Sequence, residues 1–200
     1  MIERRRLAAA FRAQGWVLTA TQLAALGVYP RRQQELLSAS LMERVGRGLY
    51  RWHEADITEQ HSLVLAQRLA PRGVVCLLSA LVFHRLTTQR APDVWMAFER
   101  DTDKPPARQV VVIHAVRFFG SSFHEGIERR RVDGVELRVY SVAKTVVDCF
   151  RYRNKVGLDV ALEALREAWN ARRFQMDEVT RLARLLRVAR VMQPYLESLV

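Results

Sequence analysis

The stretch from residue 19 to residue 52 constrains the fold most, because it contains the signals for two short helices in close succession. Thr19 or Thr21 can begin the first helix, since a threonine hydroxyl accepts hydrogen bonds from free backbone N–H groups at a helix N-terminus. Leu23 and Leu26 follow three positions apart, which places both on one side of that helix. The first helix therefore has a defined start and a side to bury.

A tight turn separates the two helices. Gly27 ends the first helix, and Pro30 stands where a helix N-terminus tolerates proline, so the second helix is predicted to begin near Arg31. Two amphipathic helices joined by a turn of three or four residues that contains glycine are typical of a helix-turn-helix unit. The sequence therefore predicts such a unit between residues 19 and 40.

The second helix is predicted to have a buried and an exposed side when residues 31–40 are placed at 100° per residue. The buried side, anchored by two leucines, contains Gln33, Leu36, Leu37 and Ser40. The exposed side contains Arg31, Gln34, Glu35 and Ser38, with Arg32 at its margin. These exposed side chains suit nucleic acid, because arginine pairs with guanine, glutamine with adenine, and serine with bases or phosphates. Glu35 has two interpretations, as an acceptor from a cytosine amine or as the partner of Arg31 four residues earlier.

Two strands are predicted after this helix. Residues 41–45 and 49–52 flank Gly46, Arg47 and Gly48, and glycines permit the positive φ angles of a tight hairpin. A cation at the hairpin tip is placed to enter a minor groove or to contact a phosphate. Two helices followed by such a hairpin have the order of a winged helix-turn-helix, and this order predicts DNA binding.

The composition becomes polar at residues 53–56, which indicates a domain boundary. We therefore predict an α+β protein, with a winged helix-turn-helix domain at residues 1–54 that begins with a helix over 2–14. A mixed α+β domain at residues 55–200 is expected to contain a small sheet and a helical C-terminal end. The candidate DNA-binding residues are Thr21, Gln22, Tyr29, Arg31, Arg32, Gln34, Ser38, Arg44, Arg47 and Arg51.

The second domain is predicted to begin with a helix over 58–69. Residues 74–78 fit a buried strand or the approach to a helix, and Ser79 is a candidate N-cap for a helix through Leu86. Strands are predicted at 94–98, 110–114, 117–119 and 135–140, with a polar loop over 100–108. Helices are predicted at 141–152, 158–169 and 179–189, followed by a short turn from Pro194.

Charge favours a polyanionic partner, since the chain carries a net charge of +11. Residues 1–52 contain nine basic and three acidic side chains, residues 53–140 twelve and eleven, and residues 141–200 eleven and seven. The arginines at positions 172, 173, 181, 184, 187 and 190 form either a second phosphate- or RNA-contacting surface or a solvated face. Lys144, Asp148 and Arg151 recur at i, i+4 and i+7, which predicts an ion-pair ladder on a helix surface.

Candidate residues are present for one class of enzyme, a nuclease with a restriction-nuclease-like site. Asp93 and Glu136 would be its metal-binding carboxylates. Such sites use a lysine beside the water nucleophile, whereas this chain has Arg138, which does not readily accept a proton. Glu136 is therefore interpreted as an exposed strand residue. The histidines and cysteines lack metal-ligand spacing, so we expect no metal, no cofactor and no catalytic residues. Cys76 and Cys149 are expected to be buried as small apolar residues.

Membrane association is not expected. No run of 18 or more apolar residues occurs, and the N-terminal residues lack the pattern of a signal peptide, so we expect a cytoplasmic protein.

Two parts of the sequence resemble the AbiEi-type antitoxins of type IV toxin–antitoxin and phage-defence systems, which also act as transcriptional repressors. The first part, residues 27–32 leading to 41–51, is similar to the winged-helix segment of that family. The second, residues 74–86, 93–95 and 140–148, resembles its C-terminal domain. Together the two parts extend over most of the chain.

The resemblance implies a repressor that binds inverted repeats in double-stranded DNA upstream of its own operon and also acts as an antitoxin. Its functional partner would be a nucleotidyltransferase-like toxin, which such antitoxins counter without a stable complex. Inverted repeats suit either a dimer or two separate monomers. Three alternatives stay open: a nucleic-acid-processing enzyme, a stand-alone winged-helix regulator without a toxin, and a C-terminal domain that serves only oligomerisation or as an adaptor.

Overall fold

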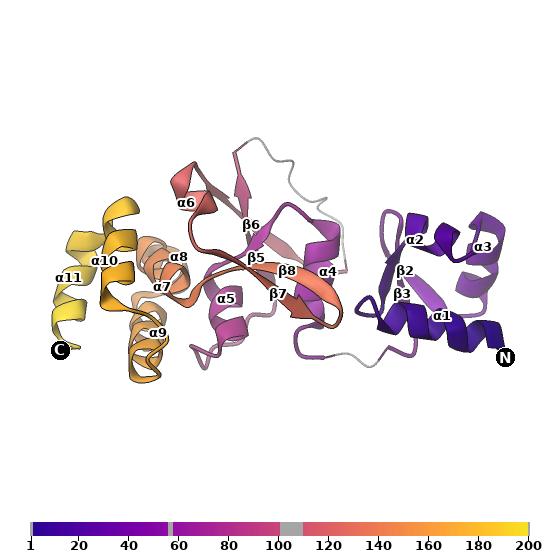
Figure 1. Cartoon of the computed structure of the whole chain (residues 1–200), viewed down its shortest axis with the longest axis horizontal. Helices are drawn as coiled ribbons and strands as arrows, with labels where there is room; N and C mark the ends of the chain where they lie inside the picture. Colours follow the sequence, from indigo (N-terminus) through magenta and orange to yellow (C-terminus); the bar gives the residue numbers. More distant parts are fainter. Residues whose placement is uncertain (1, 56–57, 101–109, 200) are drawn as a thin grey trace. The chain divides into compact units, whose positions relative to one another are not determined.

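The computed structural model describes residues 2–55, 58–100 and 110–199 (Figure 1). The described residues form two compact units. The first contains the residues up to Pro71 together with 110–112 and Arg131–Leu137, and the second contains 72–100, Ile113–Arg130 and 138–199. The domain boundary predicted after residue 54 stays a prediction. The first compact unit continues past this position and includes helix α4 (His61–Leu69). Residues 101–108 of the predicted polar loop lie outside the described residues.

The first unit begins with three helices and a three-stranded sheet. Its elements are α1 (Ile2–Arg12), β1 (Val17–Thr19), α2 (Ala20–Ala25), α3 (Pro30–Ser38), β2 (Met42–Gly46) and β3 (Leu49–Trp52). The sheet is antiparallel with the order β1-β3-β2. Phe11 of α1 packs on Trp52 of β3 with ring centroids 5.3 Å apart, in a core that also holds Leu23 and Leu36. Each helix and strand expected between residues 2 and 52 is present, close to its predicted bounds.

The second unit contains most of a five-stranded mixed sheet with the order β6-β5-β4-β8-β7, of which residues 131–137 belong to the first unit. Its strands are β4 (Val74–Val75), β5 (Val94–Glu99), β6 (Ile113–Phe118), β7 (Ile127–Val132) and β8 (Val135–Tyr140). Its helices are α5 (Leu77–His84), α6 (Ser121–His124), α7 (Val142–Arg151), α8 (Arg153–Val156), α9 (Leu158–Asn170), α10 (Met176–Leu185) and α11 (Ala189–Glu197). The chain is thus mixed α+β, as predicted. None of the described helices is both long and apolar enough to cross a membrane.

The strand predictions in the second unit need two corrections. A single strand, β6, replaces the strands expected at 110–114 and 117–119, because its parallel register with β5 begins at the pair Val94↔Ile113 and ends at Glu99↔Phe118. Val110 and Val112 precede this register and are more than half exposed. Strand β7 was not predicted, because its three consecutive arginines hide the alternation that marks a strand.

Three helix predictions are also wrong in detail. Ser79 is not a cap: it lies inside α5, where its hydroxyl bonds to Asp93 O at 3.3 Å and accepts from Trp95 N at 2.9 Å. The helix expected over 179–189 breaks at residues 186–188, where Arg187 adopts a left-handed backbone with a φ of 59°. Pro194 does not start a turn, because it lies inside α11.

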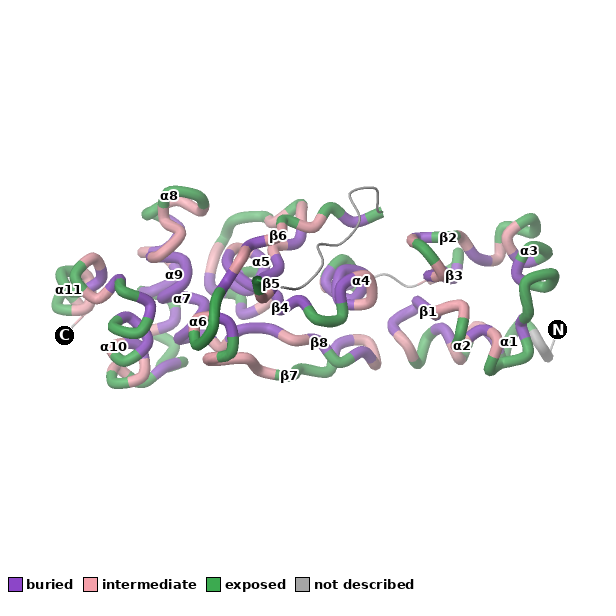
Figure 2. The backbone as a smooth tube through the Cα atoms, turned by 90° about the horizontal axis from the view of Figure 1, so that it is seen from above, coloured by how far each residue is buried: buried purple, intermediate pink, exposed green. Residues whose placement is uncertain are grey.

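The largest correction concerns helix α7. Lys144 and Asp148 do not form a surface ladder: both side chains are 0% exposed and pair with each other in the core of the second unit. Every residue from Val142 to Phe150 is buried, because α5, α9 and α10 all pack against α7 (Figure 2). A helix surrounded in this way has no solvent face, so polar residues on its second side must find partners inside the protein.

The buried pair is enclosed by aromatic rings. The Lys144 ammonium lies 4.1 Å from the Tyr140 ring centroid and 4.6 Å from the Phe118 ring centroid. Burial raises the pKa of Asp148 to about 6 even though Lys144 opposes the shift, and burial lowers the pKa of Lys144. Cys76 and Cys149 are buried in the same core, as predicted, and burial raises the pKa of both thiols.

Candidate nucleic-acid interface

Helix α2 begins where the sequence predicts. Thr19 is its N-cap and accepts from Gln22 N at 3.1 Å, while the Gln22 side chain accepts from Thr19 N at 2.9 Å. This reciprocal pair is a capping box, which fixes the path from strand β1 into the helix. The Gln22 amide, a predicted DNA contact, is therefore engaged in holding the helix start. Thr21, beside it, is exposed.

The turn between α2 and α3 is held by a side chain that sequence reasoning placed on the buried side without giving it a role. Gln33 is 8% exposed, and its amide donates to Val28 O at 2.9 Å. Pro30 occupies the first turn of α3 as expected, and Tyr29 before it is 63% exposed. A buried amide bonded to the turn carbonyl fixes the direction of α3 relative to α2. The signal in the sequence was a polar residue, Gln33, on the side that the leucines anchor.

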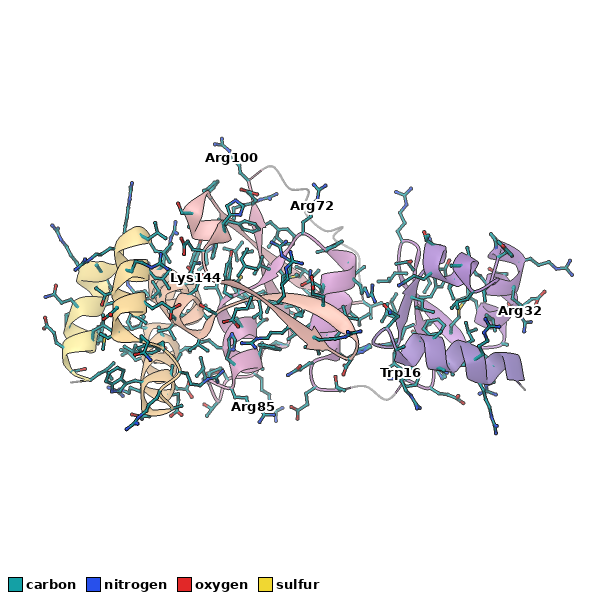
Figure 3. The ribbon with its side chains drawn as sticks, viewed as in Figure 1. Trp16, Arg32, Arg72, Arg85, Arg100 and Lys144 are labelled. Atoms are coloured by element: carbon teal, nitrogen blue, oxygen red, sulfur yellow. The ribbon has the colours of Figure 1, made fainter. Side chains whose placement is uncertain are left out.

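The outward side of α3 has the predicted composition. Arg31, Arg32, Gln34 and Ser38 are all exposed, whereas Leu36 is buried and Leu37 is partly buried. The expectation for Ser40 is wrong: it follows the helix with a φ of 53° and is exposed, because α3 ends at Ser38. Figure 3 shows Arg32 on this helix. The exposed side thus presents two cations, an amide and a hydroxyl.

Glu35 forms ion pairs within α3. Its carboxylate lies 2.8 Å from Arg32 and 3.5 Å from Arg31, so the nearer partner is the residue three positions earlier rather than four. The hydrogen bond from Arg32 lowers the pKa of the exposed Glu35 carboxyl. Arg31 keeps a side chain that is 96% exposed. Without DNA, the Arg31 side chain therefore points into solvent, and its ion pair with Glu35 is the longer of the two.

The β2–β3 hairpin has an irregular register that shifts between Arg44 and Gly46. The two glycines of the hairpin suit their positions for different reasons. Gly48 adopts a φ of 66°, as a tight turn requires, whereas Gly46 packs closely on Leu69, whose side chain would have to shift to admit a Cβ. Arg47 between them is exposed in the turn. The predicted tip cation is therefore where the sequence placed it.

The other two cations predicted on the hairpin are partly engaged. Arg51 lies opposite Glu43 in the antiparallel register, and the two form an ion pair at 2.6 Å. Arg44 is exposed, and its Nε donates to Gly46 O at 3.3 Å. Cross-strand ion pairs stabilise a hairpin, so Arg51 has a structural role in the free protein. Arg31 and Arg47 remain as the predicted contacts that are most open to a polyanion.

The carboxylates of the nuclease alternative come from strands that are not neighbours, since Asp93 precedes β5, Glu136 lies in β8, and β4 stands between these two strands. Asp93 instead accepts from His114 at 2.8 Å, and the His114 ring stacks on Trp95 with centroids 4.8 Å apart. Sequence reasoning missed this surface cluster, whose members meet because Trp95 and His114 are partners in the β5–β6 register. No group of three metal-ligating side chains occurs within the described ranges.

A scan of known protein families found no match to this chain, and a search of the curated proteins found none either.

Proposed function

We propose that the first unit is a winged helix-turn-helix that binds double-stranded DNA, with α3 as the recognition helix and the β2–β3 hairpin as the wing. The observation that carries the proposal is the division of α3 into two sides. Leu36 and Gln33 tie the helix to its own unit, and Arg31, Arg32, Gln34 and Ser38 face outward. A recognition helix in the major groove needs such an outward set of bidentate donors and acceptors.

The exposed cations divide between two tasks. Arg31 suits a bidentate contact to guanine, with Gln34 and Ser38 beside it for adenine and phosphate. Arg47 at the hairpin turn suits a phosphate or a minor groove, where charge rather than base identity decides binding. Excess positive charge in residues 1–52, nine basic against three acidic, supplies the sequence-independent attraction.

Footprinting tests this proposal. The wild-type protein is expected to protect an inverted repeat upstream of its own gene from DNase I, and Arg31→Ala is expected to lose that protection at equal concentration. Arg90→Ala, which removes the same charge from an exposed position of the second unit, is the matched control. Protection that is equal in all three proteins, or absent from the wild type, contradicts the proposal.

We further propose, from the resemblance to AbiEi-type antitoxins, that the protein represses its own operon and counters a nucleotidyltransferase-like toxin without a stable complex. Co-expression with such a toxin, encoded next to this gene, is expected to restore growth, and purification of the two is expected to yield no complex. The proposal includes no catalytic step. Metal-dependent cleavage of plasmid or RNA by the protein, lost in Asp93→Ala or Glu136→Ala, would support the nuclease alternative instead.

A further inference from the structure

The connection between α9 and α10 lines a cavity of about 450 Å³ that is open to solvent at the surface of the second unit. Its lining residues are Trp169, Asn170, Arg172, Phe174 and Gln175. This volume lies within the range of small-molecule sites, which is about 300–1,000 Å³. All five residues belong to the end of α9 and the turn that follows it. One short segment therefore supplies both the aromatic and the polar walls.

The aromatic wall is held in place from the core. Phe174 is 6% exposed, and its ring centroid lies 5.9 Å from that of Trp169, with the ring planes inclined by 38°. Trp169 is only half-buried, so part of the indole remains open at the cavity. Aromatic rings attract other planar rings through stacked or edge contacts. A supported indole of this kind suits a planar aromatic ligand.

The polar wall carries positive charge and unused hydrogen-bonding groups. The side chains of Asn170, Arg172 and Gln175 form no hydrogen bond or ion pair with other residues that the structure describes, and none of the described lining residues is a carboxylate. The negative end of α9 is satisfied locally, since backbone N–H groups at residues 171–173 donate to its last carbonyls at 2.9–3.0 Å. Among these five lining residues, Arg172 is the one with a charged side chain.

We propose that this cavity binds a planar aromatic molecule that carries one anionic group. The ring packs against Trp169, and the anion accepts two parallel hydrogen bonds from Arg172, the geometry that guanidinium groups form with carboxylates and phosphates. Asn170 and Gln175 bond to polar atoms on the ring edge. Nucleoside monophosphates and aromatic carboxylates share this chemistry, and the experiment distinguishes them. The site lies outside the proposed DNA interface and does not depend on it.

The test is isothermal titration calorimetry on the full chain without DNA, since the four tryptophans would confuse a fluorescence signal. The probes are adenosine 5′-monophosphate, with adenosine and inorganic phosphate as its fragments, and 4-hydroxybenzoate, with phenol as the fragment that lacks the carboxylate. At least one anionic aromatic probe is expected to bind tighter than its fragments by a factor of about ten or more, because the ring and the anion are recognised together. Binding of only one probe identifies the source of the ligand and supports the proposal.

The two matched variants replace arginines that have the same backbone conformation. Arg172 and Arg187 are both exposed, both adopt a left-handed backbone with φ of 53° and 59°, and both follow a helix, but only Arg172 lines the cavity. Arg172→Gly is expected to weaken binding about tenfold or more, since it removes a charge-assisted contact, whereas Arg187→Gly leaves binding unchanged. Trp169→Leu is expected to weaken binding of the aromatic probes, whereas the heat measured on titration with inorganic phosphate is expected to stay unchanged. No saturable binding of either aromatic probe, or an equal loss in the two arginine variants, overturns the proposal.

Discussion

Helices α3 and α7 each carry an acidic side chain four residues after a basic one, yet their surroundings are opposite. On α3, Arg31 and Glu35 are exposed, and on α7, Lys144 and Asp148 have no solvent contact. The outward side of α3 is open, whereas α5, α9 and α10 enclose α7. The same spacing therefore serves a solvated face in one unit and a buried pair in the other. What decides its role is how many elements pack around the helix.

The pKa shifts of the two carboxyls follow this difference. For Glu35 the hydrogen bond from Arg32 is the largest influence and lowers the pKa. For Asp148 burial is the largest influence and raises the pKa to about 6, although Lys144 donates to it. The Asp148 Oδ1 atom is buried and receives no hydrogen bond from the described residues. An exposed partner is thus enough to stabilise a carboxylate, whereas a buried partner does not fully offset the loss of water.

The largest expected effect comes from breaking the buried pair. Asp148→Ala leaves the Lys144 ammonium buried without its partner, which costs about 3–5 kcal/mol of unfolding free energy. The double variant Lys144→Met/Asp148→Leu fills similar space without charge and is expected to recover most of that loss. Urea unfolding measures both. A single variant as stable as the wild type would show that the pair is not buried in solution.

A second prediction concerns pH. The pKa of Asp148 is about 6 in the folded protein, above the ordinary value of 3.8, so the folded state takes up the proton more readily than the unfolded chain. The resulting stabilisation is complete below pH 3.8 and is lost as the pH rises through 6. The wild type is therefore expected to gain stability relative to Asp148→Asn between pH 7 and pH 5, on the order of 1 kcal/mol.

The comparison with Asp148→Asn is needed because other groups titrate in the opposite sense. Burial lowers the pKa of His61 and His84, so protonation of these histidines destabilises the folded state as the pH falls. Both histidines are present in the variant and in the wild type, so their effect cancels in the difference. A difference that stays constant, or that moves against the wild type at lower pH, contradicts the account of the buried pair.

The smallest effect on stability is expected on α3. Glu35→Gln removes two exposed ion pairs, so its urea midpoint should match that of the wild type. The same change removes a negative charge from the proposed DNA-contacting side, beside both arginines. DNA affinity is therefore expected to rise, by roughly fivefold at most, in a fluorescence anisotropy titration. A fall in affinity would instead indicate that Glu35 accepts from a cytosine amine.

Local signals predicted much of the first unit. Thr19, Gly27 and Pro30 mark the helix ends, and each acts over a few residues, so the sequence alone reveals them. Eight of the ten predicted contacts are exposed, namely Thr21, Tyr29, Arg31, Arg32, Gln34, Ser38, Arg44 and Arg47. The engagement of Gln22 in a capping box and of Arg51 with Glu43 depends on cap geometry and strand register, which composition does not show.

The second unit was less predictable, because its features depend on contacts between distant segments. Lys144 and Asp148 have the spacing of a surface pair, and their burial depends on three helices that pack around α7. The start of β6 at Ile113 is set by its register with β5, and neither Val110 nor Val112 differs in type from strand residues. The hydroxyl of Ser79 bridges two residues about fifteen positions later, a contact that no local pattern indicates.

DNA binding by the exposed side of α3 and by the hairpin tip is tested most directly by one fluorescence anisotropy experiment. It compares the wild type, Arg31→Ala and Arg47→Ala on the upstream duplex and on a scrambled duplex over a range of salt concentrations. Arg31→Ala is expected to lose roughly tenfold affinity or more for the upstream duplex and little for the scrambled one. Arg47→Ala is expected to weaken both equally and to reduce the logarithmic salt slope by about 1. A wild type that binds both duplexes equally, or two variants that bind as the wild type does, would contradict DNA recognition by α3 and the hairpin.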